Sequence, residues 1–376
     1  MSHFLKKFFL FLAPFGLIFI LPITVFLLSR EYYTIDRALL VEKEHPNAVI
    51  GLAYSNISGL KNALVAKNNP TVFALGTSRT GQFRKEFFTA SSTFVTASNS
   101  VVSIDGMKKF IEELPDDNKT EIVILGLDPN MFLPSYLHEY PSETDYERLK
   151  DLFLGRWRNF YIAYFSGRFS IKELWIRSGQ TESIGLTGIM REEGFRPDGS
   201  YQYRKKLSEP NREELLKSDM DTSISLLRAN RSNPYYNQYS DPFSKDVILS
   251  LDELLTLCQK KHLYVVAYIP PFPPLVYQEL IRLPDGQKEN VLQLPAALRE
   301  TLSRHDFDFY DFSDSTILGK HDNEFIDPSH GTDKYYLRMI LYMAERNKRL
   351  SEYVDIPKDN KLLQNANKDY LDDVLK

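Results

Sequence analysis

Three residue types that can together activate a hydroxyl group occur at two distant places in this chain of 376 residues. Ser78 lies in a polar turn that follows Gly76, and Asp327 and His330 form an Asp-x-x-His segment near the C-terminus. A serine hydroxyl is a weak nucleophile until an imidazole accepts its proton. A carboxylate orients that imidazole and stabilises its protonated form. If the fold brings these residues together, we expect acyl-transfer chemistry, with Ser78 as nucleophile, His330 as base and Asp327 as orienting carboxylate.

Acyl transfer also needs hydrogen-bond donors for the oxyanion that develops on the carbonyl. The backbone N–H of Ser78 and the side chain of Asn99 are the first candidates for these donors. Arg79, Asp128 and Asn130 are further candidates, either for binding substrate or for supporting the site. Each residue also has a simpler interpretation, because serine and aspartate after a strand commonly serve only as turn or cap residues. The combination is what favours a site.

The elements that must position these residues can be read from the hydrophobic pattern. Short, almost wholly apolar runs predict buried strands at 71–75, 93–97, 121–127, 263–269 and 307–312. Apolar residues at three- and four-residue spacing predict helices at 103–114, 245–259, 289–303 and 333–347, the last with Thr332 as a plausible N-cap. Strands that alternate with helices indicate an open, doubly wound α/β sheet.

This topology explains why residues so far apart could meet. Ligands of open parallel sheets bind beyond the carboxyl ends of the strands. Ser78 follows the first predicted strand, Asn99 the second and Asp128 the third, while Asp327 and His330 follow the fifth. A hydroxyl, an amide, carboxylates and an imidazole are therefore expected at one edge of the sheet.

Several other kinds of site are not expected. The single cysteine, Cys258, cannot form an internal disulfide and lies in an apolar helical run that predicts burial. No histidines or cysteines have metal-ligand spacing, and no Gly-x-Gly-x-x-Gly or Walker loop occurs, so we expect neither a metal nor a nucleotide cofactor. The formal net charge of −4 argues against nucleic acid as a partner.

The N-terminal residues predict a membrane anchor. Positions 8–28 contain no charged residue, and Lys6 and Lys7 precede them. At 1.5 Å rise per residue such a run matches a hydrocarbon core of roughly 30 Å. The positive-inside rule then predicts a single-pass protein with a cytoplasmic N-terminus and its body in the periplasm or otherwise outside the cytoplasm. The alternative is a cleaved signal peptide, although no small-residue cleavage site follows.

The predicted organisation is an anchor over 1–30, a neck over 31–69, an α/β domain over 70–349 and a polar C-terminal tail over 350–376. The stretch from about 130 to 240 breaks the alternation of strands and helices and reads as one large insertion, or lid.

The sequence segments around Ser78 and around Asp327 and His330 resemble the first and last motif blocks of the SGNH (GDSL-like) hydrolase superfamily. Its first block is Gly-Asp-Ser after strand one, here Gly76-Thr77-Ser78, and its last is Asp-x-x-His, here Asp327 to His330. The middle blocks differ: no second-block glycine lies near Asn99, and the usual Gly-x-Asn-Asp reads Gly126-Leu127-Asp128-Pro129-Asn130. The resemblance implies a flavodoxin-like three-layer α/β/α sandwich with a Ser-His-Asp triad.

The layout is most similar to the membrane-anchored members of that superfamily that act in lipoteichoic-acid D-alanylation and alginate O-acetylation. This resemblance implies a serine esterase or O-acyltransferase with an acyl-Ser78 intermediate. The implied partners are a cell-envelope polysaccharide or lipid-linked polymer, the inner membrane and a multispanning membrane O-acyltransferase. Because the middle blocks are degraded, a second interpretation is a non-catalytic scaffold of the same fold that binds an envelope polymer. A third is a lipase, which a membrane anchor would suit, but a lipase predicts an apolar lid and the insertion here is charged.

Overall fold

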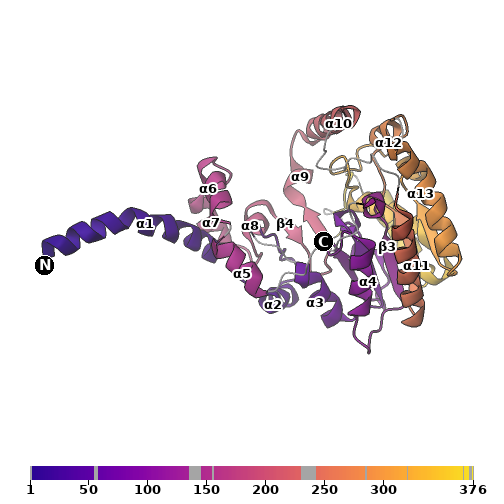
Figure 1. Cartoon of the computed structure of the whole chain (residues 1–376), viewed down its shortest axis with the longest axis horizontal. Helices are drawn as coiled ribbons and strands as arrows, with labels where there is room; N and C mark the ends of the chain where they lie inside the picture. Colours follow the sequence, from indigo (N-terminus) through magenta and orange to yellow (C-terminus); the bar gives the residue numbers. More distant parts are fainter. Residues whose placement is uncertain are drawn as a thin grey trace. The chain divides into compact units, whose positions relative to one another are not determined.

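A computed structural model of the chain describes residues 2–54, 58–134, 145–154, 156–229, 243–283, 286–319, 321–366, 368–371 and 375. The chain forms two compact units (Figure 1). Unit 1 comprises Met1–Leu60, Ser142–Pro197 and Tyr201–Lys205, and unit 2 comprises Lys61–Pro141, Asp198–Ser200 and Lys206–Lys376. Residues 135–144 and 230–242 of the predicted insertion lie outside the described part of the chain.

Unit 2 is built on a five-stranded sheet in which every pairing is parallel. Its strands are β1 (Val72–Gly76), β2 (Phe94–Ser98), β3 (Ile122–Gly126), β6 (Tyr264–Ile269) and β7 (Asp308–Asp311). The order across the sheet is β2-β1-β3-β6-β7. All residues of β1, β2 and β3 are buried, as expected for strands covered on both faces. The predicted α/β fold with a parallel sheet is confirmed.

Helices cover both faces of this sheet. On one face α4 (Ile104–Glu112), α11 (Lys245–Lys260) and α13 (Gly286–Ser303) lie side by side (Figure 1). There Phe73 of β1 meets Phe110 of α4 with ring centroids 5.9 Å apart. On the other face lies α14 (Asp333–Ala344), which begins at the predicted N-cap Thr332, whose side chain accepts from the N–H of Tyr335. The arrangement is that of a three-layer sandwich.

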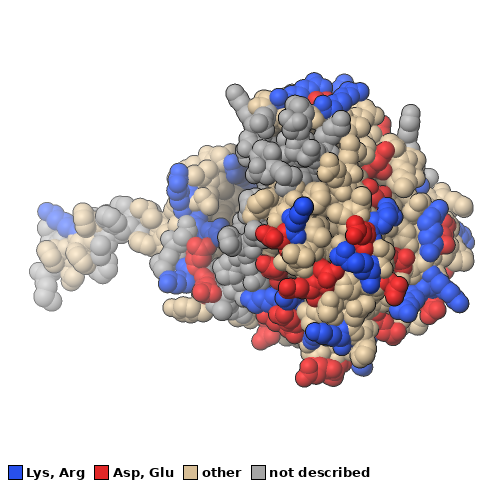
Figure 2. All heavy atoms as spheres, turned by 45° about the vertical axis from the view of Figure 1, so that its right-hand side comes forward, with Lys and Arg blue, Asp and Glu red and all other residues tan. Residues whose placement is uncertain are grey.

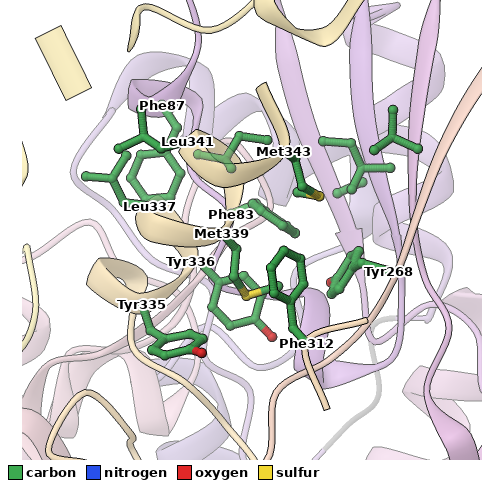
Figure 3. Close-up of a cluster of buried hydrophobic side chains, with 14 of the residues drawn as sticks. Phe83, Phe87, Tyr268, Phe312, Tyr335, Tyr336, Leu337, Met339, Leu341 and Met343 are labelled. Carbon is green, nitrogen blue, oxygen red and sulfur yellow. The ribbon is translucent and has the colours of Figure 1, made fainter. Parts of the chain in front are cut away.

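The core under α14 is unusually aromatic. The ring of Phe83 packs edge-on against Tyr268 of β6 and Tyr336 of α14, with centroids 5.5 and 4.9 Å apart. Figure 3 shows these three rings gathered with Phe312 and the apolar residues of α14. The hydroxyl of Tyr336 donates to the Arg79 carbonyl and that of Tyr268 to the Thr80 hydroxyl, so this core contacts the turn that carries Ser78.

The remaining elements of unit 2 complete its surface. They are α10 (Arg212–Arg228), α12 (Pro274–Leu280), α15 (Lys348–Ser351) and α16 (Ile356–Asn365). Helix α16 packs on α14, and Leu350, Val354 and Leu371 of the segment predicted as a polar tail are buried. On the face that Figure 2 shows, acidic and basic side chains are interspersed among the described residues.

The chain passes from unit 1 to unit 2 within helices α3 (Ser58–Asn68) and α9 (Arg204–Ser208). Helix α3 leads into unit 2 for the first time, and α9 does so again after the insertion. The turn Asp198–Ser200 belongs to unit 2, where the Asp198 carbonyl accepts from the N–H of Thr96 at 2.7 Å. This contact satisfies a donor on β2, which is an edge strand of the sheet.

Unit 1 is mainly helical. It contains α1 (Ser2–Leu28), α2 (Ile35–Glu44), α5 (Asp145–Leu154), α6 (Trp157–Phe165), α7 (Ile171–Ser178) and α8 (Leu186–Arg191). Strands β4 (Glu193–Phe195) and β5 (Tyr201–Tyr203) form an antiparallel pair. The rings of Phe26, Tyr54 and Phe160 contact one another in its core.

The predicted membrane anchor over residues 1–30 and the single-pass topology are wrong, and the predicted placement of the body outside the cytoplasm, which was inferred from that anchor, loses its basis. Among the helices of the described residues, none combines the length and the apolar character that crossing a bilayer requires. In addition, Val25 and Phe26 at the end of α1 are buried in the core of unit 1.

Candidate active site

The structure brings Ser78, His330 and Asp327 together at the carboxyl edge of the sheet. The Ser78 Oγ lies 2.9 Å from His330 Nε2, and His330 Nδ1 lies 2.9 Å from Asp327 Oδ1 and 3.1 Å from Oδ2. The imidazole thus has the hydroxyl on one nitrogen and the carboxylate on the other, which is the arrangement that general-base activation of a serine requires. The His330 side chain is 15% exposed, so the site is open to solvent on one side.

The Asp-x-x-His segment is a turn organised by its own carboxylate. Asp327 Oδ1 accepts hydrogen bonds from the N–H groups of Ser329 and His330 at 2.9 and 3.0 Å. The Ser329 hydroxyl also lies 3.0 Å from His330 Nδ1. Burial by itself raises the pKa of Asp327, but the neighbouring His330, Lys206 and the backbone donor outweigh it and hold the pKa well below its usual range. Asp327 is therefore ionised at neutral pH.

Two glycines and a threonine pack together at the turn that carries Ser78. Ser78 begins the short 3-10 helix η1 (Ser78–Thr80), directly after β1. A Cβ atom on Gly76 or Gly126 would overlap the hydroxyl of Thr80, so the glycines at the ends of β1 and β3 make room for it. That hydroxyl accepts from the Tyr268 hydroxyl at 3.2 Å. Burial raises the pKa of Tyr268 well above its ordinary value, so it remains a neutral donor.

The buried side chain of Arg79 links the loops around the site. It is 5% exposed. The guanidinium donates to the carbonyls of Ser329 at 3.0 Å, Pro270 at 3.1 Å and Pro271 at 2.7 Å, and it lies 3.5 Å from an Asp128 oxygen. Arg79 therefore supports the site, which was one of its two predicted roles, and its buried guanidinium is committed to protein groups.

The other predicted residues are placed less centrally. Asp128 is buried and caps the 3-10 helix η3 (Pro129–Phe132), and its Oδ2 accepts from the hydroxyl of Thr77 at 3.2 Å. Asn130 lies in η3 with a buried Oδ1 that has no hydrogen-bond partner among the described residues. Asn99 is exposed at a φ of 58°, and no hydrogen bond links it to the three central residues in the described part of the chain.

The backbone N–H of Ser78 is a candidate donor for an oxyanion. The N–H of Ser78 is at the first position of η1, where no intrahelical acceptor exists, and it makes no hydrogen bond among the described residues. It is therefore available to a substrate. The exposed Asn99 is not held in place as a second donor.

Sequence reasoning missed four supporting residues: Thr77, Thr80, Ser329 and Lys206. The first three lie within two residues of the predicted centre, and their hydroxyl groups in a Thr-Ser-Arg-Thr turn and beside a histidine were an available signal. Lys206 lies in α9 with its Nζ 3.5 Å from Asp327 Oδ2. No local pattern marks it, because only the fold brings that helix to the Asp-x-x-His turn.

No group of three or more His, Cys, Asp or Glu side chains in the described part of the chain lies close enough to hold a metal ion. No known family, curated protein or solved structure matches this chain.

Proposed function

We propose that this protein is a serine esterase or O-acyltransferase of the SGNH type that forms an acyl-Ser78 intermediate. The observation that carries the proposal is the 2.9 Å contact between Ser78 Oγ and His330 Nε2, with Asp327 on the opposite ring nitrogen. The order of the sheet, with the second strand outside the first and the others following, is that of flavodoxin-like folds. This agrees with the fold that the resemblance implies.

The chemistry follows from the three side chains. His330 Nε2 accepts the proton of the Ser78 hydroxyl as Oγ attacks an ester carbonyl, and the tetrahedral oxyanion accepts from the N–H of Ser78. His330 then donates that proton to the leaving alcohol, which departs and leaves an ester on Ser78. Water or an acceptor hydroxyl then attacks this ester while His330 takes the proton of the attacking group. As the ester bond to Ser78 breaks, His330 returns that proton to Oγ. Asp327 balances the positive charge of His330 in both half-reactions.

Which acceptor completes the reaction separates hydrolysis from transfer. The resemblance favours an acyl group on a hydroxyl-rich glycan or polymer, and we include this substrate class in the proposal. The second candidate is a non-catalytic scaffold of the same fold that binds polymer. The exposed position of Asn99 favours it, because efficient acyl transfer usually requires more than one fixed oxyanion donor.

A fluorophosphonate probe distinguishes the two, because it labels only an activated serine. We expect the full-length chain to be labelled at Ser78, as located by peptide mapping, and the Ser78→Ala variant to stay unlabelled. His330→Ala should be labelled slower by a factor of about 10³ or more. Ser100→Ala is a matched control, since Ser100 follows the neighbouring strand and its buried hydroxyl has no partner among the described residues. A folded wild-type protein that takes no label at Ser78 would refute the enzymatic proposal and favour the scaffold.

Substrate class is tested on the same protein. Release of acetate from O-acetylated oligosaccharides in the absence of an acceptor indicates hydrolysis, and transfer of label from acyl-Ser78 to an added oligosaccharide indicates transferase activity. Acylation by a simple aryl ester without turnover on either glycan would leave the serine chemistry intact and exclude the glycan.

A further inference from the structure

A cavity of about 490 Å³ lies beside β7, the last strand of the sheet. Its lining residues come from α13, from β7, from α14, and from the 3-10 helix η5 (Ser315–Leu318) with the turn before it. All of these elements belong to unit 2. The volume is within the range of about 300–1,000 Å³ that is usual for ligand pockets. Ser78, Asp327 and His330 do not line this cavity, so it is separate from the triad.

The backbone of β7 provides polar groups to this cavity. Strand β7 pairs with β6 alone, so its other side has no neighbouring strand among the described residues. The N–H of Phe312 donates to the Ile269 carbonyl of β6. Successive residues of a strand direct their N–H and C=O groups to opposite sides, so those of Phe309 and Asp311 point away from β6. Both residues line the cavity, where these groups can pair with a ligand.

Three charged side chains at the cavity keep hydrogen-bonding capacity. The Arg299 guanidinium lies 5.2 Å from the ring centre of Phe309 and has no hydrogen-bond or ion-pair partner in the described part of the chain. Asp311 and Asp314 each use Oδ1 to accept from the N–H two residues later, at 2.9 Å. No described group donates to Oδ2 of either carboxylate. A ligand in the cavity thus meets a set of unused donors and two unused acceptors.

Apolar surface completes the lining of the cavity. The rings of Tyr310 and Tyr342 lie nearly perpendicular with centroids 6.3 Å apart, and Ile317 is 49% exposed. The lining therefore carries one positive and two negative groups beside apolar surface. A ligand with a single full charge would be repelled by one of the two kinds of charged group. A neutral ring with an apolar face and hydroxyl groups on its rim suits both, because a hydroxyl group donates and accepts.

We propose that this cavity binds one sugar unit of a neutral, hydroxyl-rich glycan. Hydroxyl groups of the sugar donate to the free oxygens of Asp311 and Asp314 and accept from Arg299, while its C–H groups contact Tyr342 and Ile317. The inference deepens the proposed function, and it rests on that function for the role of the glycan as substrate.

The position of β7 makes the cavity a remote part of the substrate site. Strands β3 and β6 separate β7 from β1, the strand that leads to Ser78. Three strand spacings of about 4.8 Å place β7 about 14 Å from β1. A single sugar cannot reach from the cavity to Ser78, whereas a chain of several units can. The cavity therefore holds one unit of a polymer while a different unit reacts.

Binding is measured by isothermal titration calorimetry on the full-length chain with unacylated hexasaccharides of glucose, mannose and N-acetylglucosamine. We expect at least one of them to bind, and the Kd to rise by about 10–100-fold in Arg299→Met, because hydrogen bonds to a charged group are lost. Asp311→Asn should also weaken binding, since asparagine keeps the Oδ1 acceptor of the turn but replaces the free Oδ2 with a donor. Arg304→Met is the matched control, because Arg304 is 52% exposed after the end of α13 and does not line the cavity.

Binding of none of the hexasaccharides, or an equal loss of affinity in Arg304→Met, would overturn the inference. So would an unchanged affinity in both Arg299→Met and Asp311→Asn, because the glycan would then bind elsewhere. Glycine is titrated as a small zwitterion. If it binds in place of the hexasaccharides and loses affinity in Arg299→Met, the cavity recognises paired charges and the assignment to a glycan is refuted.

Chain length links the cavity to the reaction. With O-acetylated oligosaccharides as substrates, Arg299→Met should raise the KM of hexasaccharides by a larger factor than that of disaccharides, which are too short to occupy both places. An equal factor for both lengths would overturn the inference. Binding of glycan by a wild-type protein that takes no fluorophosphonate label would refute the acyl chemistry and support the cavity assignment. Labelling of Ser78 without binding of glycan would refute the cavity assignment alone.

Discussion

Arg79 offers the sharpest test of how the site is held together. Replacing it with methionine keeps the apolar stem but removes the guanidinium from the carbonyls of Ser329, Pro270 and Pro271 and from Asp128. Removing one partner of a buried ion pair costs about 3–5 kcal/mol, because the other charge stays buried. The three carbonyl groups lose charge-assisted hydrogen bonds of about 1.5–3 kcal/mol each, but these losses overlap with the first. We expect a total of about 4–6 kcal/mol.

The free energy of unfolding is measured by urea denaturation of the full-length protein, and labelling of Ser78 reports on the site. Arg79→Lys should be intermediate, because one ammonium group cannot reach all the acceptors of a guanidinium. It also provides a folded sample if the methionine variant does not fold. Arg304→Met is the matched control: Arg304 is 52% exposed in its pairs with Asp252 and Glu300, so its loss should cost less than about 1 kcal/mol.

The outcome that would refute this reasoning is a loss below about 1 kcal/mol in Arg79→Met together with unchanged labelling of Ser78. The guanidinium would then be no more important than a surface charge. Loss of stability with unchanged labelling would show that the arginine supports the fold without positioning His330 through Ser329.

Three further predictions concern single residues. Asp327→Asn should lower the rate of Ser78 labelling by about 10³–10⁴-fold with little change in stability, since an amide cannot balance the charged imidazole. Gly199→Ala should cost more than about 1 kcal/mol in thermal or urea unfolding, because Gly199 has a φ of 80° and a Cβ would overlap the Thr96 carbonyl. Burial raises the pKa of Asp359 from 3.8 to about 7 against the opposing charge of Lys358, and Asp355 adds to the rise. The unfolded chain thus loses this proton first, so stability should fall by up to about 4 kcal/mol between pH 4 and 7, and Asp359→Asn should abolish that slope.

The sheet strands were predictable to within one or two residues. The predicted runs at 71–75, 93–97 and 121–127 correspond to β1, β2 and β3. Strands buried on both faces must be apolar throughout, so each is visible as a short run without reference to the rest of the chain. The amphipathic helices α4, α11 and α14 were predicted for the related reason that one stripe of each faces the core.

The central part of the site was also implied by the sequence. Because all strands of the five-stranded sheet run parallel, the residues after β1 and β7 had to lie at one edge, and Ser78 and His330 do meet there. The role of Arg79 could not be chosen in advance, since the same side chain suits a substrate or a backbone carbonyl. The anchor failed because absence of charge in 8–28 says nothing about packing, and Phe26 lies in a protein core.

The sequence by itself thus determined the kind of sheet, its strands and the chemistry that follows them, because burial and turn formation depend on neighbouring residues. Only the tertiary structure decided which groups complete the site. Lys206 reaches Asp327 from another helix, and the Thr80 hydroxyl fits between Gly76 and Gly126 on adjacent strands. These contacts join residues far apart in the chain, and their energies depend on distances that no local pattern encodes.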